Sequence, residues 1–380
     1  MQRSISIVIK VTNSCNLNCV YCYNRDNVIP GVISLSVIEN MLSTLWSRFD
    51  HADFIWHGGE PLLAGQDFFR TVKALQEKYV SGRDDKSYKN LIQTNGTLVT
   101  GNFVEWCRDE DFSIGISIDG PKEITGESRP AFELDAYEKS IEAIETIRSV
   151  NDGVGVICVI HKLNAAMGRE LYAFFKRIGV DSVVLLPNMN DPRIEPYHLC
   201  NNDYVCFHKA FFDAWVADDD PVGTIVPFRQ IVNALLGNQP SLCSYSGGCF
   251  RNFLSLDVDG SVYPCSAFFG SDFYLGNVNT SSIAEIYDSP KLQQLRAEMK
   301  QMLSTECGEC EFLTVCQGGC REAAFIASGK LYSKDPHCEG RKELFGYIRE
   351  VLKSQLGQRL AEKAKYPASN ERNWDLVHHR

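Results

Sequence analysis

The sequence predicts an α/β protein with a parallel sheet, followed by a smaller cysteine-rich domain. Two observations support this prediction. Short apolar runs alternate with amphipathic helical stretches over the first half of the chain, and this repetition implies a parallel sheet with right-handed crossovers. Eight of the 15 Cys residues then fall between residues 243 and 338. That change in composition marks a second domain.

The predicted strands are apolar on both faces, as buried strands of a parallel sheet are. Six strands are expected, at residues 4–11, 53–57, 89–94, 112–118, 154–160 and 181–187. Amphipathic patterns predict helices between them, at residues 36–49, 68–79, 102–110, 136–150 and 169–178. Ser36 and Glu39 are spaced as a capping box for the first helix. A last helix is expected at residues 343–365, with a polar, partly disordered tail at 366–380.

Composition excludes some classes of function. Asp and Glu outnumber Lys and Arg by 48 to 38, for a net charge of -10, and no basic run suited to nucleic acid is present. No apolar run has the length of a membrane helix, and the amino terminus lacks a signal-peptide hydrophobic region. We expect a cytoplasmic protein whose Cys residues bind metal, because a reducing compartment disfavours disulfides.

Three Cys residues directly follow the first predicted strand, in the run CNLNCVYCYN. They are Cys15, Cys19 and Cys22, and the next Cys is Cys107. A four-iron cluster normally has four Cys thiolate ligands, so three ligands leave one iron open to a small molecule. A zinc site with a distant fourth ligand is the alternative interpretation of the same triplet.

Further motifs follow the next strands in order: HGGEP at 57–61, QTNG at 93–96 and SIDGP at 117–121. Each alone is an ordinary strand-ending turn. Together with the Cys triplet, the series resembles the radical S-adenosylmethionine (radical SAM) family. The resemblance implies a partial (βα)6 TIM barrel over residues 1–190 and SAM as the ligand of the open iron. Ligands of such sheets lie at the carboxyl ends of the strands, where these motifs lie.

The resemblance also implies which residues contact SAM. Gly58, Gly59 and Glu60 would anchor its methionyl group. Ser117 and Asp119 would contact the ribose, and Tyr23 the adenine edge. Asn95 and Arg129 are further candidates, although each of them could equally be a turn former or a surface residue.

The second Cys group resembles the SPASM extension of radical SAM enzymes, in which two auxiliary clusters have interleaved ligands. By that order, the first auxiliary cluster would be bound by Cys243, Cys249, Cys265 and Cys320. The second would be bound by Cys307, Cys310, Cys316 and Cys338. Two zinc sites with four thiolates each are the alternative. We expect three 4Fe-4S clusters, a SPASM domain at 241–340, a helical bridge at 191–240 and a carboxyl-terminal helix and tail at 341–380.

The implied chemistry is hydrogen abstraction by a 5'-deoxyadenosyl radical, which the cofactors supply. An electron donor such as flavodoxin or ferredoxin is therefore an expected partner. SPASM proteins act mostly on peptides or proteins, so a precursor peptide or protein is the expected substrate. A non-catalytic iron-sulfur electron-transfer protein and an enzyme acting on a small molecule remain open.

Two peptide-modifying subclasses fit the layout: anaerobic sulfatase-maturating enzymes, which form formylglycine from Cys or Ser, and maturases that crosslink peptides. The sulfatase-maturating enzymes typically have an acidic residue after the cysteine of the YPC run, Gln before Gly-Gly-Glu, and an aromatic residue two positions after the triplet. Here these positions hold Ser266, His57 and Asn24. We therefore predict an oxidative crosslink of cyclophane, C-C or ether type, with formylglycine formation as the alternative. His57, Ser266 and Asp272 are the candidate proton acceptors.

Overall fold

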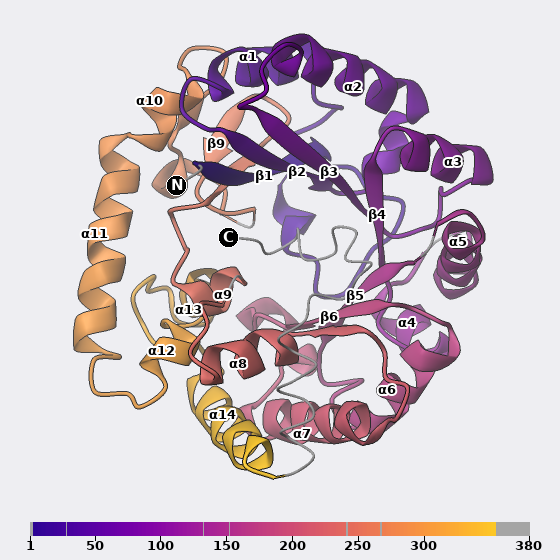
Figure 1. Cartoon of the computed structure of the whole chain (residues 1–380), viewed down its shortest axis with the longest axis vertical. Coiled ribbons are helices and arrows are strands. Elements are labelled where there is room, and N and C mark those ends of the chain that lie inside the picture. Colours follow the sequence, from indigo (N-terminus) through magenta and orange to yellow (C-terminus); the bar gives the residue numbers. More distant parts are fainter. Residues whose placement is uncertain are drawn as a thin grey trace.

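The computed structural model describes residues 3–27, 29–131, 133–151, 153–240, 242–266 and 268–354. Its strands form one ten-stranded sheet in the order β10-β9-β8-β1-β2-β3-β4-β5-β6-β7. The pairings from β1 through β7 are all parallel. Figure 1 shows the strands curving around the interior with the helices outside them. The predicted α/β fold with a parallel barrel-like sheet is confirmed.

All six predicted strands are present. They are β1 (Ser4–Thr12), β2 (His51–Gly58), β3 (Ser87–Thr94), β4 (Phe112–Ser117), β5 (Gly155–Ile160) and β6 (Ser182–Pro187). Eight of the nine residues of β1 are buried, as a strand covered on both faces requires. A seventh strand, β7 (Thr224–Val226), pairs in parallel with β6 and was not predicted.

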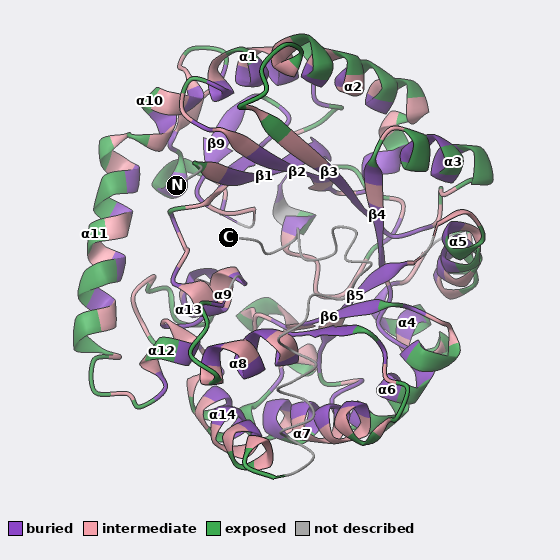
Figure 2. Ribbon diagram, in the orientation of Figure 1, coloured by how far each residue is buried: buried purple, intermediate pink, exposed green. Residues whose placement is uncertain are grey.

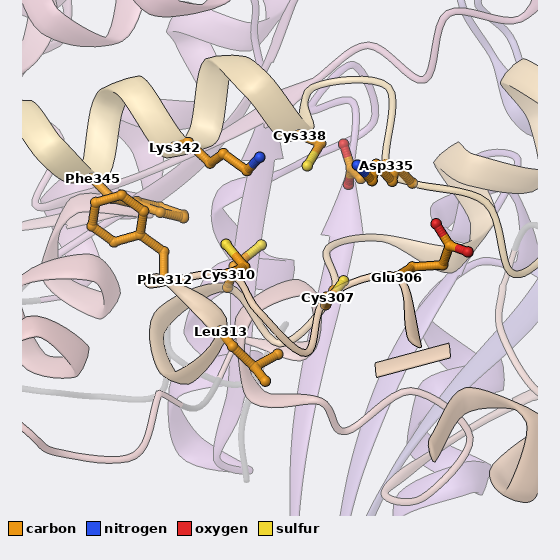
Figure 3. A pocket seen from close by; sticks show the side chains of 12 residues that line it. Glu306, Cys307, Cys310, Phe312, Leu313, Asp335, Cys338, Lys342 and Phe345 are labelled. Atoms are coloured by element: carbon orange, nitrogen blue, oxygen red, sulfur yellow. The ribbon is translucent and has the colours of Figure 1, made fainter. Parts of the chain in front are cut away.

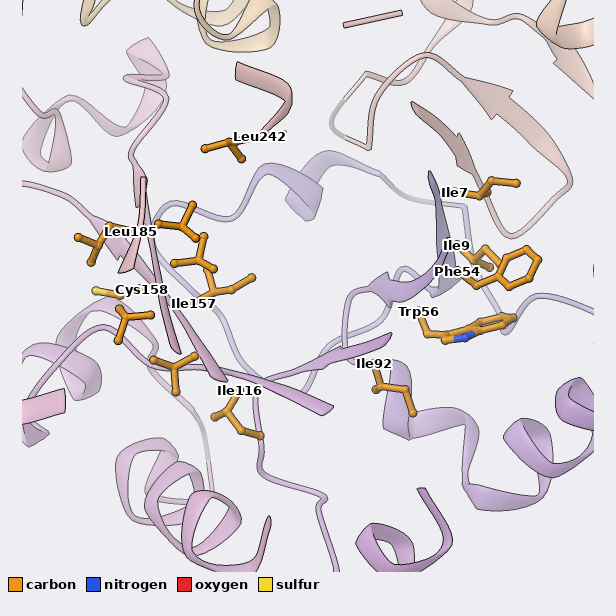
Figure 4. Close-up of a cluster of buried hydrophobic side chains, with 14 of the residues drawn as sticks. Ile7, Ile9, Phe54, Trp56, Ile92, Ile116, Ile157, Cys158, Leu185 and Leu242 are labelled. Atoms are coloured by element: carbon orange, nitrogen blue, oxygen red, sulfur yellow. The ribbon is translucent and has the colours of Figure 1, made fainter. Parts of the chain in front are cut away.

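The predicted helices lie between these strands. They are α1 (Leu35–Leu45), α2 (Gln66–Val80), α3 (Gly101–Asp109), α5 (Ala136–Val150) and α6 (Gly168–Arg177), with a short α4 (Lys122–Ser128) in addition. Figure 2 shows that they bury the side that faces the strands. Apolar side chains of neighbouring strands, such as Ile9, Trp56 and Ile116, form part of the core beneath them (Figure 4).

The predicted capping box of the first helix is wrong. The N-cap is Ser34, whose hydroxyl accepts a hydrogen bond from the backbone N–H of Val37. The carboxylate of Glu39 instead accepts from Lys78 Nζ at 2.6 Å and from the Tyr79 hydroxyl at 3.2 Å. Glu39 thus bonds to α2 and not to the backbone at Ser36, because the two donors on α2 lie within hydrogen-bonding distance.

The cysteine-rich region joins the same sheet. Strand β8 (Phe253–Leu256) pairs in parallel with β1, and β9 (Ser261–Tyr263) and β10 (Gly276–Asn277) extend this edge in antiparallel fashion. One sheet thus includes strands on both sides of the domain boundaries predicted at residues 190 and 241. The segments that carry Cys249 and Cys265 therefore flank a hairpin that pairs with β1, the strand that precedes the Cys triplet.

The remaining helices lie beyond β6. The bridge contains α7 (Asn201–Ala217) and α8 (Phe228–Leu235), and the later helices are α9 (Cys243–Ser246), α10 (Ile283–Tyr287), α11 (Pro290–Thr305), α12 (Leu313–Cys316), α13 (Arg321–Ser328) and α14 (Cys338–Leu352). Short 3-10 turns are η1 (Tyr23–Asp26), η2 (Pro61–Ala64), η3 (Pro192–Tyr197) and η4 (Ser271–Phe273). The predicted tail at 366–380 and the end of the last predicted helix lie outside the described residues. Within the described part of the chain, no helix has the length and apolar character needed to cross a membrane.

Candidate active site

The Gly-Gly-Glu turn after β2 packs directly on the loop that carries Cys15. The backbone N–H of Gly59 donates to the carbonyl of Thr12 at 2.7 Å, and that of Glu60 donates to the carbonyl of Ser14 at 2.9 Å. Gly58 has φ +112°, and a Cβ there would lie 2.3 Å from the Thr12 oxygen. A Cβ on Gly59 would lie 2.0 Å from the Ser14 oxygen. Only glycine permits this approach at both positions.

The carboxylate of Glu60 holds the end of the next strand. It is fully buried and accepts hydrogen bonds from Thr94 Oγ1 at 2.7 Å, from the Asn95 N–H at 2.8 Å and from the Leu62 N–H at 3.0 Å. Burial raises its pKa to about 6. Asn95 Nδ2 in turn lies 3.8 Å from Cys15 Sγ. These contacts link the ends of β2 and β3 to the first Cys of the triplet, so both residues position the cluster loop. Their predicted contacts with SAM remain predictions.

Asp119 and Arg129 form a buried ion pair beside the triplet. The carboxylate accepts from Arg129 Nε at 3.0 Å and Nη2 at 3.1 Å, from Ser128 Oγ at 2.8 Å and from the Val159 N–H at 3.0 Å. The Tyr21 hydroxyl also donates to it. Burial alone would raise the pKa of Asp119, but the charge of Arg129 and the nearby His161 hold it well below its usual range.

This ion pair brings a positive charge to the Cys triplet. Arg129 Nη1 lies 3.9 Å from Cys19 Sγ. Because Asp119 already accepts hydrogen bonds from five donors, its main structural role is to hold Arg129, and its ribose contact stays a prediction. Sequence analysis missed Tyr21, although its place between two cluster Cys residues was a usable signal.

The three triplet thiols lie close enough to influence one another. The pKa of Cys19 is raised to about 12, mainly by burial; Arg129 acts against this rise, and the thiols of Cys22 and Cys15 add to it. Burial also raises the pKa of Cys15, where Cys22 again contributes. Such thiols are poorly ionised alone, and a bound metal provides the charge that stabilises the thiolates.

Tyr23, His57 and Ser266 meet next to the last Cys of the triplet. The ring centres of Tyr23 and His57 are 6.3 Å apart in an edge arrangement, and the Ser266 side chain hydrogen-bonds to Tyr23. Burial lowers the pKa of His57 to about 4, so its ring is neutral near pH 7. Its Nδ1 accepts from the Gly58 N–H at 2.7 Å.

The other predicted residues lie as follows. Ser117 Oγ, at the end of β4, accepts from Gln93 Nε2 at 2.8 Å. Asp272 lies exposed on η4. Tyr23 contacts Ser266 and His57, as described above. The roles predicted for Tyr23, Ser117 and Asp272 are not tested by this arrangement.

The second auxiliary set lines one pocket. Its four predicted ligands are Cys307, Cys310, Cys316 and Cys338, and Lys334 and Lys342 also line the wall. Figure 3 shows the sulfur atoms of Cys307, Cys310 and Cys338 at the edge of this space. Four Cys residues separated by up to 31 positions in the chain thus lie around one pocket, and their role as cluster ligands stays a prediction.

The first auxiliary set gathers around a buried carboxyl group. Glu322 Oε2 lies 3.5 Å from Cys265 Sγ. Burial raises the pKa of Cys243, Cys249 and Cys320, and Glu322 adds to the rise. Burial raises the pKa of Glu322 itself to about 7. Sequence analysis missed Glu322, because a Glu at the start of a short helix normally faces solvent.

The thiol donors of the second auxiliary set fit an iron-sulfur cluster. A cubane occupies the space between its four thiolate ligands, and the pocket lined by Cys307, Cys310, Cys316 and Cys338 provides such a space.

The close approach of Gly59 to the cluster loop gives a first prediction. Gly59→Ala would push Ser14 away and displace Cys15, so we expect an iron content lower by about four atoms per chain. Iron assay of the reconstituted protein checks this. The control is Gly126→Ala, because Gly126 lies on exposed α4 with open space around it. Equal iron contents in both variants would contradict the prediction.

Family comparisons agree with this geometry. A model described as the radical SAM superfamily matches residues 9–175, and one described as an iron-sulfur cluster-binding (SPASM) domain matches residues 249–311. The cysteine-type anaerobic sulfatase-maturating enzyme of Clostridium perfringens is 30% identical over 365 residues, which are 90% of this chain and 96% of the relative. The serine-type enzyme of Bacteroides thetaiotaomicron is 27% identical over 353 residues, 85% of this chain and 84% of the relative.

Solved structures show the same relationship. Native anSMEcpe with bound AdoMet has a TM-score of 0.84 at 28% identity, covering 93% of this chain and 99% of that chain. Streptococcus suis SuiB bound to its precursor peptide SuiA has a TM-score of 0.65 at 15% identity, covering 88% and 75%, and shows a shared fold only. The chain therefore belongs to the radical SAM enzymes that carry a SPASM iron-sulfur domain, in the family that includes the anaerobic sulfatase-maturating enzymes.

Proposed function

We propose that this protein oxidises the side chain of a Cys or Ser residue within a peptide or protein to formylglycine. The observation that carries the proposal is the near full-length relationship to the cysteine-type sulfatase-maturating enzyme, at 30% identity over 96% of that enzyme. A similar structure, also at a TM-score of 0.84, contains anSMEcpe with the Cp18Cys peptide. A peptide segment is therefore the substrate class that we propose here.

The proposal includes three four-iron clusters, bound by the triplet and by the two auxiliary Cys sets. When bound, the reduced cluster and SAM supply the radical that removes a hydrogen atom from the substrate. The chain places the reaction: the Gly58-Gly59 turn is fixed on the Cys15 loop, and Arg129 lies beside Cys19. Flavodoxin or ferredoxin as electron donor and a cytoplasmic location complete the proposal.

The relatives favour formylglycine over the crosslink that the sequence predicted. The structure weakens one argument for the crosslink. That argument relied on Ser266 at a position where an acidic residue was expected, yet the carboxyl group of Glu322 lies 3.5 Å from the sulfur of the preceding Cys265. An acidic side chain from a different segment thus lies beside this cysteine.

Crosslinking remains the second candidate on one observation. Tyr23, His57 and Ser266 meet next to the last Cys of the triplet, and the identities of His57 and Ser266 differ from the residues typical of sulfatase-maturating enzymes. A change in these side chains would alter which substrate atom is presented to the radical. The product assay below separates the two reactions.

Peptides containing Cys or Ser in a sulfatase-like segment test the proposal. The enzyme is incubated with reductant, SAM and each peptide, and the products are analysed by mass spectrometry and by a hydrazide probe for aldehydes. We expect an aldehyde at the Cys or Ser position and none in the matched Ala peptide. Deoxyadenosine without aldehyde from either peptide would refute formylglycine formation, and an aldehyde-free product lacking two hydrogens and containing an inter-residue bond would establish crosslinking.

A further inference from the structure

Lys10 is a buried cation inside the barrel. It lies on β1, its side chain is 1% exposed, and His57 is its register partner on β2. Val8 and Ile55, two residues earlier on these strands, pack together in an apolar interior cluster. Since alternate residues of a strand share a face, Lys10 lies in the next layer toward the carboxyl ends of the strands.

The charge of Lys10 is only partly compensated. Asp257 is the one carboxylate within ion-pair distance in the described part of the chain, and its Oδ2 lies 3.4 Å from Lys10 Nζ. This distance exceeds the roughly 2.8 Å of a strong charge-assisted hydrogen bond. Nζ makes no hydrogen bond to any described residue. Asp257 meanwhile accepts from Asn13 at 3.0 Å, from Asn27 at 2.6 Å and from the Val258 N–H at 2.7 Å.

The groups around Lys10 place it between the SAM site and the first auxiliary set. Phe269 lies under Nζ, 5.6 Å from its ring centre. Burial lowers the pKa of Lys10, and three acidic neighbours act in the opposite direction and favour the ammonium form: Asp257, Cys265 and Glu322. The charge of Lys10 also contributes to the lowered pKa of His57.

An electron added to a cluster with four thiolate ligands increases a negative charge that is already present. The reduction potential of such a cluster depends on the net charge and hydrogen bonding around its sulfurs, and Coulomb interactions are strong where water is excluded. Lys10 is a buried cation whose Nζ lies 5.6 Å from the ring centre of Phe269, four positions after Cys265 of the first auxiliary set.

We propose that Lys10, held by Asp257, raises the reduction potential of the first auxiliary cluster and so favours its reduced state. Lys10 is thus a positioning residue that acts through the cluster. Reduction of this cluster takes up one electron and no proton, and the ammonium offsets the added charge. The inference rests on the auxiliary clusters proposed above, and it is independent of the substrate reaction.

Redox titration of the auxiliary clusters tests this role. The parent protein is Cys15→Ala/Cys19→Ala/Cys22→Ala, so that only the two auxiliary clusters remain and two midpoint potentials are followed by electron paramagnetic resonance. In Lys10→Met we expect one midpoint to shift to a lower potential and the other to stay unchanged. Lys10→Arg keeps the cation and should restore the parent value. Lys10→Gln replaces Lys10→Met if the latter binds less iron than the parent.

A largely covered lysine at the other end of the strands provides the control. Lys86 is 9% exposed and pairs with Asp50 at 2.9 Å, next to the start of β3 and thus at the opposite end of the strands. Lys86→Met should leave both midpoints unchanged. The role of Lys10 would be overturned if both midpoints stayed unchanged in Lys10→Met and in Lys10→Gln. It would also be overturned if Lys86→Met shifted a midpoint as much as Lys10→Met does. A parent with about four rather than about eight irons would overturn the cluster assignment itself.

Discussion

Replacing Cys15, Cys19 and Cys22 together with Ala should abolish the formation of 5'-deoxyadenosine from SAM. In the proposed assignment, the triplet supplies all three protein ligands of the cluster with the open iron, and each of the two auxiliary sets has four thiols of its own. We expect chromatography to detect no deoxyadenosine above the protein-free reaction. The iron content should fall from about 12 to about 8 atoms per chain, because the auxiliary clusters keep their ligands.

Cys200 and Cys206 provide the control for this experiment. Both are exposed on or next to α7 and lie outside the predicted ligand sets. Cys200→Ala/Cys206→Ala should keep both the iron content and the deoxyadenosine formation of the wild type. Deoxyadenosine formation by the triple Cys variant would remove the central assignment of the site.

The strands could be predicted because their signals are local, whereas the cluster-ligand sets remain predictions. Each of the six long strands contains apolar residues and is buried over most of its length, and such a segment has few alternatives in a chain of alternating helices. For the auxiliary Cys residues, the family pattern predicts which residues belong to the same set as well as their spacing. That pattern assigned Cys338 to the set that lines one pocket with Cys307, Cys310 and Cys316.

The remaining features depend on contacts between distant segments. Strand β7 has three residues and β8 has four, too few for a periodic signal. The parallel pairing of β8 with β1 is decided by tertiary packing, which local sequence does not report. Likewise, the sequence around Lys10 does not indicate that it is a buried cation, because its ion-pair partner Asp257 lies 247 positions later in the chain. Buried charges of this kind are visible only once both partners are placed.

Asp119→Asn is the second change for which we expect a large effect. Removing the negative charge leaves Arg129 as an uncompensated cation in a buried site, where breaking an ion pair costs about 3–5 kcal/mol. Asn keeps only one acceptor oxygen, so Arg129 would also lose one of the two hydrogen bonds, at 3.0 and 3.1 Å, that hold it beside Cys19. Thermal unfolding should therefore begin at a lower temperature, and deoxyadenosine formation at saturating SAM should fall by at least about tenfold, the equivalent of 1.4 kcal/mol.

An exposed Arg–Asp ion pair provides the control that separates the effect of burial from the effect of losing a charge. Arg108 and Asp109 form an ion pair at 2.8 Å with side chains 43% and 63% exposed, so Asp109→Asn should cost less than about 1 kcal/mol. In Asp119→Asn/Arg129→Met both charges are absent, and the unfolding temperature should recover toward the wild-type value because no unpaired charge stays buried. Deoxyadenosine formation should stay low, since the cation beside Cys19 is missing. A double variant as unstable as Asp119→Asn alone would show that the unpaired Arg129 is not the cause of the instability.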